Sequence, residues 1–173
     1  MERTDAELVE AACSGDIASF RELYERHYAM AVGIARSCLL DLHLAEDAAQ
    51  EAFATACRGL ASLKDGRRFG QWLGTICRRT ASRMARSQTN HARLDDVPLM
   101  TSPANGDGRA AAQVRQAVDR LPTSGREVIL LHYFSGLSYE QISQTLGITP
   151  QSVHGRLQRA RRALAEELLE PDE

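Results

Sequence analysis

The sequence has few aromatic residues and no long apolar stretch. Only 5% of its 173 residues are aromatic, β-branched runs are nearly absent, and alanine and leucine are abundant. Strands are enriched in the residues that are scarce here, so the composition favours an all-α protein. Neither a signal peptide nor an apolar run of roughly 18 residues occurs, which predicts a cytoplasmic protein that does not insert into a membrane.

Motifs of metal sites and of common enzymes are also missing. The four cysteines form no CxxC pair and show no metal-ligand spacing. Cys38 and Cys77 fall near apolar helix faces, where we expect small buried side chains. No glycine-rich phosphate loop, HExxH motif or supportable Ser-His-Asp set occurs. We therefore expect no bound metal, no cofactor and no enzymatic activity.

Charged residues, in contrast, are abundant and segregated. The chain has a net charge of −2, but residues 1–63 carry 5 basic and 11 acidic side chains. Residues 64–94 carry 8 basic side chains against Asp65 alone. Blocks of opposite sign indicate that different surfaces of the molecule bind different partners.

Helix signals divide the chain into three parts. The expected parts are a helical domain (residues 1–90), a flexible linker without periodicity (91–110) and a second small helical domain (111–173). In the first domain, Thr4 and Glu7 predict a capping box and Asp16 predicts an N-cap. In the second domain, Ser124 and Glu127 predict another capping box at the start of a helix.

The stretch LSYEQISQTLGITPQSVHGRLQRARRAL predicts two helices joined by a very short turn. Ser138 and Gln141 form a capping box for the first helix, and Gly147 stands where a helix needs a left-handed end. Thr149 and Pro150 then supply an N-cap and a proline at the first helical position. This spacing is typical of a helix-turn-helix, although any αα-hairpin of a helical bundle shares it.

The outer face of the second of these helices favours DNA binding. No acidic residue occurs between Gln151 and Ala165, although four arginines do. A solvated helix face usually mixes both signs of charge, because pairs four residues apart support the helix. We interpret this segment as a DNA recognition helix, since such side chains contact phosphates and base edges. The side chains off its apolar stripe are His154, Arg156, Gln158, Arg159, Arg161 and Arg162.

A second cationic stripe is predicted on a helix from about Phe69 to Ser87. Trp72, Arg79, Arg83 and Arg86 are 7, 4 and 3 residues apart, which places them on one helix face. Basic residues beside an aromatic ring suit unpaired strands, which offer phosphates and exposed bases. The alternative is that Trp72 is simply part of the core.

Two blocks of the sequence resemble bacterial sigma factors. LPTSGREVILLHYFSGLSYEQISQTLGITPQSVHGRLQRARRAL is similar to their C-terminal, promoter-binding domain. EDAAQEAF followed by FGQWLGTICRR is similar to their conserved helical domain. Two helical domains and a short linker resemble the compact extracytoplasmic-function type of the sigma-70 family. The resemblance runs from about Asp16 to Leu169.

The resemblance implies a sigma factor that binds core RNA polymerase and directs it to promoter DNA. The residues implied to dock on the β′ clamp helices of polymerase are Asp47, Gln50 and Glu51. Those implied to recognise and melt the minus-ten element, including the loop LKDGRRF that would capture a flipped base, are Lys64, Arg67, Arg68, Trp72, Arg79, Arg83 and Arg86. Those implied to bind the minus-thirty-five element are Ser152, His154, Gly155, Arg156, Arg159 and Arg162.

The sequence departs from the family pattern at Arg79, Gly155 and Ser143 and in the segment TSG of residues 123–125. Arg79 stands where the family usually has Asn, and Gly155 stands where Ser is common. These two departures put the minus-ten contact and one recognition contact in question. Ser143 replaces the usual Ala inside the helix-turn-helix, but it is small enough for close packing.

Two other classes of function stay open. A free-standing helix-turn-helix regulator would explain the C-terminal domain but would leave the N-terminal block without a role. A decoy could retain the fold and sequester an anti-sigma factor or polymerase, although the arginine face argues against it. The sequence does not show whether an anti-sigma factor holds the chain inactive.

Overall fold

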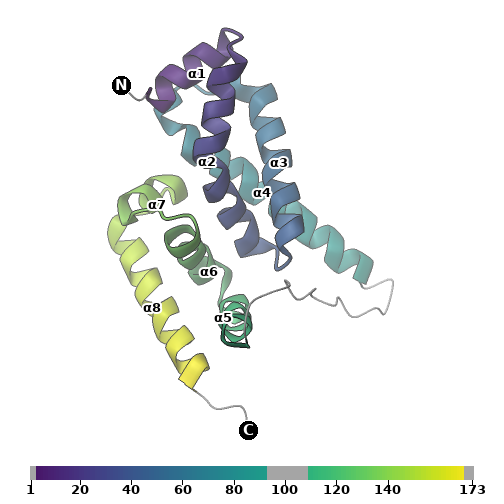
Figure 1. Cartoon of the computed structure of the whole chain (residues 1–173), viewed down its shortest axis with the longest axis vertical. Coiled ribbons are helices and arrows are strands. Elements are labelled where there is room, and N and C mark those ends of the chain that lie inside the picture. Colours follow the sequence, from purple (N-terminus) through teal and green to yellow (C-terminus); the bar gives the residue numbers. More distant parts are fainter. Residues whose placement is uncertain (1–2, 93–108, 170–173) are drawn as a thin grey trace.

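The computed structural model describes residues 3–92 and 109–169, and the elements in these ranges are all helical, which confirms the expected fold class (Figure 1). Three short turns, of which the last is a π-helix, accompany eight α-helices. The α-helices are α1 (Asp5–Cys13), α2 (Ile17–Cys38), α3 (Leu42–Gly59), α4 (Phe69–Ala92), α5 (Arg109–Arg120), α6 (Thr123–Ile129), α7 (Tyr139–Leu146) and α8 (Pro150–Leu169). The turns are η1 (Leu60–Ser62), η2 (Gly66–Arg68) and η3 (Leu130–Phe134).

Most of the helix ends follow the predicted capping chemistry. The side chains of Thr4 and Ser138 each complete a capping box, and Asp16 accepts a hydrogen bond from the N–H of Ala18 at 3.0 Å. The predicted linker lies largely outside the described residues, because only its outermost residues belong to α4 and α5. Helix α4 continues past the predicted end near Ser87.

The capping box predicted for α6 is wrong. The helix begins at Thr123, with Pro122 as N-cap and no side-chain cap, so Ser124 lies within the first turn. The carbonyl of Pro122 accepts the N–H of Gly125 and that of Arg126, each at 2.9 Å. Proline already fixes the backbone at this helix start, so Glu127 is not needed there.

The carboxylate of Glu127 instead binds the guanidinium of Arg78 on α4. Glu127 is only 7% exposed, and one of its oxygens accepts hydrogen bonds from Nε and Nη2 of Arg78 at 3.0 and 2.8 Å. A carboxylate that is this buried needs a charged partner. Glu127 therefore binds Arg78 across the interface instead of capping its own helix.

One hydrophobic core runs through both groups of helices, α1–α4 and α5–α8. Helix α2 packs against α3 and α4 and also against α6 and η3, and α4 packs against α7. A Cβ atom on Gly33 would lie 2.7 Å from the Oγ of Ser135, which is closer than real Cβ contacts. Gly33 therefore lets α2 approach the end of η3 closely.

Polar contacts join the same two groups of helices. Arg36 pairs with Asp119 at 3.0 Å, and Nη1 of Arg126 donates to the carbonyl of Ser37 at 3.0 Å. Burial lowers the pKa of Arg126, although Asp119 opposes that shift. Together with the pair between Arg78 and Glu127, these contacts hold the two groups in a docked arrangement. Among the described helices, none is long and apolar enough to cross a membrane.

Candidate polymerase and nucleic-acid interfaces

Helices α7 and α8 form a helix-turn-helix with a fixed turn. Gly147 adopts φ +65°, in the left-handed region, and the N–H of Ser152 donates to Oγ1 of Thr149 at 3.2 Å. The hydroxyl of Ser143 donates to the carbonyl of Ile148 at 2.6 Å. The hydroxyl that replaces the usual alanine methyl therefore ties the turn to α7.

The outer face of α8 presents most of its predicted DNA-binding residues to solvent. Gly155 and Arg156 are half-buried, and the exposed members are Ser152, His154, Arg159 and Arg162. A Cβ atom on Gly155 would lie 3.5 Å from a guanidinium nitrogen of Arg159. This is an ordinary van der Waals distance, so a small side chain at position 155 would fit beside Arg159.

The remaining arginine of this helix, Arg161, contacts two tyrosine side chains of the same chain. Its Nε donates to the hydroxyl of Tyr133 at 2.8 Å, and its Nη2 donates to the hydroxyl of Tyr139 at 3.3 Å. The guanidinium carbon also lies 5.5 Å from the centre of the Tyr133 ring, within cation–π range. Arg161 thus braces α8 against η3 and α7 rather than pointing at a ligand.

The predicted minus-ten residues lie on α4 and on the turn before it. Lys64, Arg67 and Arg68 are exposed, as are Arg79, Arg83 and Arg86. The side chain of Arg67 is 81% exposed and pairs with Asp65 at 2.9 Å, and this hydrogen bond lowers the pKa of Asp65. The hydrogen bond to Asp65 also raises the pKa of Arg67.

Trp72 is neither free nor fully in the core. It is half-buried and packs against the core cluster. Its ring centre lies 6.2 Å from that of Phe69, and a Cβ atom on Gly59 would lie 3.7 Å from its Cζ2. One part of the indole therefore supports the fold while another part stays accessible, on the helix that carries Arg79, Arg83 and Arg86.

The predicted polymerase-binding residues lie on the exposed side of α3. Asp47, Gln50 and Glu51 are exposed, whereas Ala49 and Ala52 on the opposite side are 0% exposed. The carboxylate of Glu51 forms an ion pair with Arg83 on α4. The structure thus brings a predicted polymerase-binding residue into contact with a predicted DNA-binding residue.

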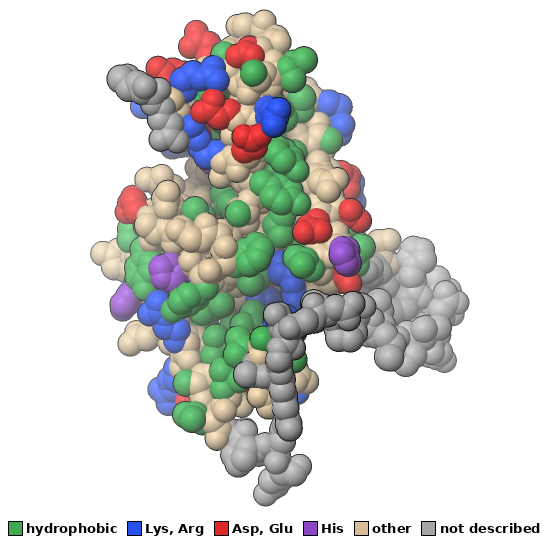
Figure 2. All heavy atoms as spheres, viewed as in Figure 1, with side chains coloured by type: hydrophobic (Ala, Val, Ile, Leu, Met, Phe, Trp, Pro, Cys, Tyr) green, Lys and Arg blue, Asp and Glu red, His purple; other side chains and the backbone are tan. Residues whose placement is uncertain are grey.

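An open groove of about 580 Å³ separates α4 from the start of α6. It is lined by Cys38, Arg78, Arg79, Ser82, Ala85, Arg86 and Thr123. The C-terminal group of helices therefore borders part of the cationic face of α4. Figure 2 shows mixed acidic and basic side chains around α1 and α2, whereas Lys, Arg and His side chains follow the edge formed by α8.

Sequence reasoning missed the contacts that join the two groups of helices. Arg78 and Glu127 are 49 residues apart in the sequence, so no local spacing signals their contact. The same holds for Arg36 and Asp119, which are 83 residues apart. The predicted cysteine environment is correct for Cys77, which is buried, while Cys38 is half-buried. Burial raises the pKa of Cys77 to about 12.

Both halves of the chain match known families. The Sigma-70 region 2 family matches residues 23–91, and the Sigma-70 region 4 family matches residues 111–164. The ECF RNA polymerase sigma factor SigM of Mycobacterium tuberculosis strain H37Rv is 32% identical over 167 residues, which cover 95% of this chain and 84% of SigM.

Two solved structures are similar over most of the chain. That of CnrH in complex with the cytosolic domain of CnrY has a TM-score of 0.70 at 29% identity, and the match covers 98% of this chain and 99% of CnrH. That of the sigma factor RpoE with the anti-sigma factor NepR from Bartonella quintana has a TM-score of 0.63 at 26% identity. This match covers 88% of the present chain and 97% of RpoE.

Proposed function

Because this chain belongs to the sigma-70 family and is an extracytoplasmic-function RNA polymerase sigma factor, we propose that its two cationic helices divide promoter recognition between them. As a sigma factor, the chain binds core RNA polymerase and directs it to promoter DNA. It acts in the cytoplasm, where polymerase works, and polymerase carries out the chemistry. The observation that carries the division is the position of the arginines: on α8 they follow the fixed turn of the helix-turn-helix, with Arg162 paired to Glu166, whereas on α4 they lie on the same helix as Trp72.

Helix α8 reads the minus-thirty-five element as duplex DNA. His154 in the second turn of α8 and Arg159 near its middle face solvent, on a helix that follows a fixed turn. Recognition helices of this motif place such residues at base edges in the major groove. Arg162 lies further along and is 83% exposed in its side chain, which suits a contact with the phosphate backbone.

Helix α4 and the loop before it hold the minus-ten element after the strands separate. The exposed cations of this region supply phosphate contacts, and the accessible part of Trp72 supplies a surface for a base. The loop of residues 63–68 lies directly before α4 and carries three of these cations. The duplex-binding helix and the strand-holding helix therefore belong to different domains, residues 111–173 and 1–90.

Contact with both promoter elements requires the two domains to separate. The elements are about 25 base pairs apart by their names, or about 85 Å at about 3.4 Å per base pair. A compact chain of 173 residues has a radius of gyration of only about 16 Å. The docked arrangement is therefore too short to contact both elements, and it is the form that an anti-sigma factor would hold. Its similarity to RpoE bound to NepR supports this assignment.

The first test is run-off transcription with core polymerase. The sigma factor is expected to direct specific starts only together with core enzyme, because its acidic N-terminal part repels DNA phosphates. A free-standing helix-turn-helix regulator, the alternative function, would instead bind promoter duplex without polymerase. That alternative is not favoured, because it gives region 2 no role.

The second test reverses charge on α3. Asp47→Lys with Glu51→Lys is expected to weaken association with core polymerase while leaving helix content unchanged, since both side chains are exposed. Glu10→Lys with Glu25→Lys is the control, because it changes net charge equally at other exposed positions. Equal affinity of wild type and the Asp47, Glu51 variant for core enzyme would refute the docking assignment.

A further inference from the structure

Helix α1 precedes the region 2 match and carries none of the residues proposed to bind polymerase or DNA. It nevertheless packs directly on η2, the turn in the loop before α4. A Cβ atom on Gly66 would lie 2.8 Å from the Cα of Ala6 and 3.3 Å from its carbonyl oxygen. Both are backbone atoms, so no side-chain rotation would relieve the clash, and the backbone at Gly66 rests on the backbone of α1.

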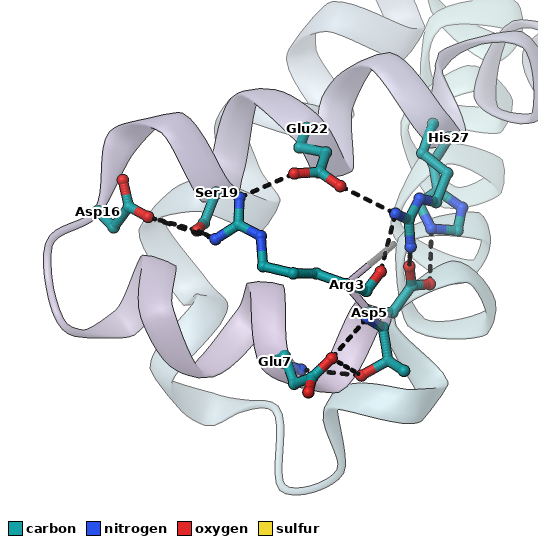
Figure 3. A network of polar contacts seen from close by, with 9 residues as sticks. Arg3, Asp5, Glu7, Asp16, Ser19, Glu22 and His27 are labelled. Atoms are coloured by element: carbon teal, nitrogen blue, oxygen red, sulfur yellow. Dashed lines mark hydrogen bonds and ion pairs between the residues drawn. The ribbon is translucent and has the colours of Figure 1, made fainter. Parts of the chain in front are cut away.

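A second contact reaches from α1 to the start of α4. Asp5, the first residue of α1, accepts hydrogen bonds from Nε2 of His27 at 2.8 Å and from Nη1 of Arg26 at 2.6 Å (Figure 3). The ring of His27 in turn lies 5.2 Å from that of Phe69, and a Cβ atom on Gly70 would lie 3.2 Å from its Cε1. Asp5 therefore fixes the surface on which α4 begins.

Further polar contacts fix the N-terminal end of α1 on α2. Nη2 of Arg3 donates to Glu22 at 2.8 Å, and Nη1 donates to the hydroxyl of Ser19 at 2.8 Å (Figure 3). Burial alone would raise the pKa of Asp5, but hydrogen bonds from His27 and Arg26 lower it below its usual value. Asp5 is therefore held as a carboxylate at the centre of this network.

The segment between the two contacts carries exposed cations. Asp65 accepts the N–H of Arg67 at 3.1 Å and so caps η2, and Arg67 and Arg68 extend into solvent. One side of this turn thus rests on α1 while the other side presents positive charge. A short loop that is held at both ends loses little conformational freedom when a ligand binds.

We propose that α1 is a platform that positions the loop of residues 63–68 to capture an unpaired base of the minus-ten strand. Asp5, Ala6, His27 and Gly66 are positioning residues in this arrangement and touch no DNA themselves. The proposal rests on the function proposed for the loop and adds the part of the molecule that sets the loop's conformation.

The test compares two DNA probes bound by the complex of this chain with core polymerase. One probe carries the single-stranded minus-ten region on a forked end, and the other is fully duplex and contains only the upstream element. Gly66→Ala is expected to lower affinity for the forked probe by roughly 10- to 100-fold, the loss that corresponds to one base no longer being held. Affinity for the duplex probe is expected to stay unchanged.

Gly125→Ala is the matched control, because its Cβ atom would meet only the Cβ of Ala160, at 3.4 Å. Asp5→Asn is the second variant, since it keeps the size of the side chain and removes its charge. It is expected to lower affinity for the forked probe less than Gly66→Ala and to relax base preference at the captured position. If Gly66→Ala does not fold, the forked-probe affinity of Asp5→Asn tests the platform role of α1 instead.

The outcomes separate this proposal from the function on which it rests. If Arg67→Ala and Arg68→Ala weaken forked-probe binding but Gly66→Ala and Asp5→Asn do not, α1 is no platform. If the arginine variants also bind as wild type does, the loop itself has no role in capture. Equal losses on both probes would mean that α1 only stabilises the fold, and would also overturn the proposal.

Discussion

Helices α4 and α8 both present a row of arginines, yet the two rows differ in what already binds them. On α8, Arg162 pairs with Glu166 of the same helix, and among the described residues no ion pair involves Arg156 or Arg159, whereas the acidic partners on α4 come from other helices. On α4, Arg78 is bound by Glu127 and Arg83 by Glu51. Equal positive charge therefore does not mean equal readiness for DNA.

The difference matches the order of events at a promoter. In the proposed function, Arg159 of α8, which is exposed, attracts duplex phosphates at long range. Arg83 of α4 first exchanges its carboxylate partner for a phosphate, and Arg78 leaves Glu127 only when the two groups of helices separate. We infer that duplex recognition by α8 precedes strand capture by α4.

The largest effect is expected from Arg159→Ala on α8. Loss of a guanidinium at a base edge costs about 1 to 3 kcal/mol of binding and relaxes preference at one base position. The measurement is binding of the polymerase complex to a library of minus-thirty-five sequences. Arg162→Ala is the control and is expected to weaken binding evenly across sequences and to flatten its salt dependence. Identical preference profiles for wild type and Arg159→Ala would refute base reading.

A smaller effect is expected from Trp72→Ala on α4. Stacking is worth about 1 to 3 kcal/mol per base, and only part of the indole is accessible. This change should therefore spare the closed complex and impair opening. A template with a pre-melted bubble is expected to rescue opening, because the unstacking cost is then removed. Permanganate reactivity of unpaired thymines measures the open complex.

The bubble template also separates stacking from charge. Arg79→Ala and Arg83→Ala are expected to weaken binding on both templates, since phosphates are present in each. Circular dichroism checks the fold of each variant. If Trp72→Ala unfolds the N-terminal domain, Trp72 is a core residue, and if the variant opens promoters normally, capture depends on the loop alone.

A still smaller effect is expected from Glu127→Gln at the domain interface. The side chain of Arg78 is 37% exposed, so solvent screens the pair and the loss of docking stability is about 1 kcal/mol. Cys38 lines the groove beside Thr123 and should react faster with a thiol reagent as the domains separate. The assay requires Cys13→Ser and Cys57→Ser, because both thiols are exposed.

Cys77 serves as the internal control in this assay. Its thiol is 0% exposed, and with a pKa of about 12 it stays protonated and unreactive near neutral pH. An unchanged rate at Cys38 in Glu127→Gln would show that the ion pair does not hold the domains together. Faster reaction at Cys77 would instead indicate that the variant unfolds.

Local chemistry predicted most of the fold. Caps at Thr4, Asp16 and Ser138 depend on side chains that reach only two or three residues along the chain, so spacing reveals them. Glu127 satisfies the same local rule but bonds across the interface, and no sequence pattern shows that its environment is buried. Arg161 similarly satisfies the rule for an exposed helix face but binds Tyr133.

For the candidate site too, features set within one helix were predictable and contacts between helices were not. Helical periodicity located the exposed faces of α3, α4 and α8, because exposure there depends on one helix and the side it buries. It did not reveal that Glu51 of α3 lies against Arg83 of α4, since that contact depends on the crossing of two helices. Which charged side chains pair with each other depends on how the helices pack in the folded protein.

The smallest effect is expected from releasing single arginines of each row. The side chains of Arg83 and Glu51 are 64% and 47% exposed, so their pair contributes about 0.2 to 1 kcal/mol to stability. Glu51→Gln should therefore leave the unfolding temperature nearly unchanged. At a concentration of core polymerase that saturates the variant, it should raise the affinity of the complex for single-stranded minus-ten DNA at low salt, because phosphate no longer competes with a carboxylate for Arg83. Glu166→Gln is the matched change on α8, where it releases Arg162, and it should raise duplex affinity instead. A gain on the same probe in both variants would mean that only net charge matters and that the two rows are equivalent.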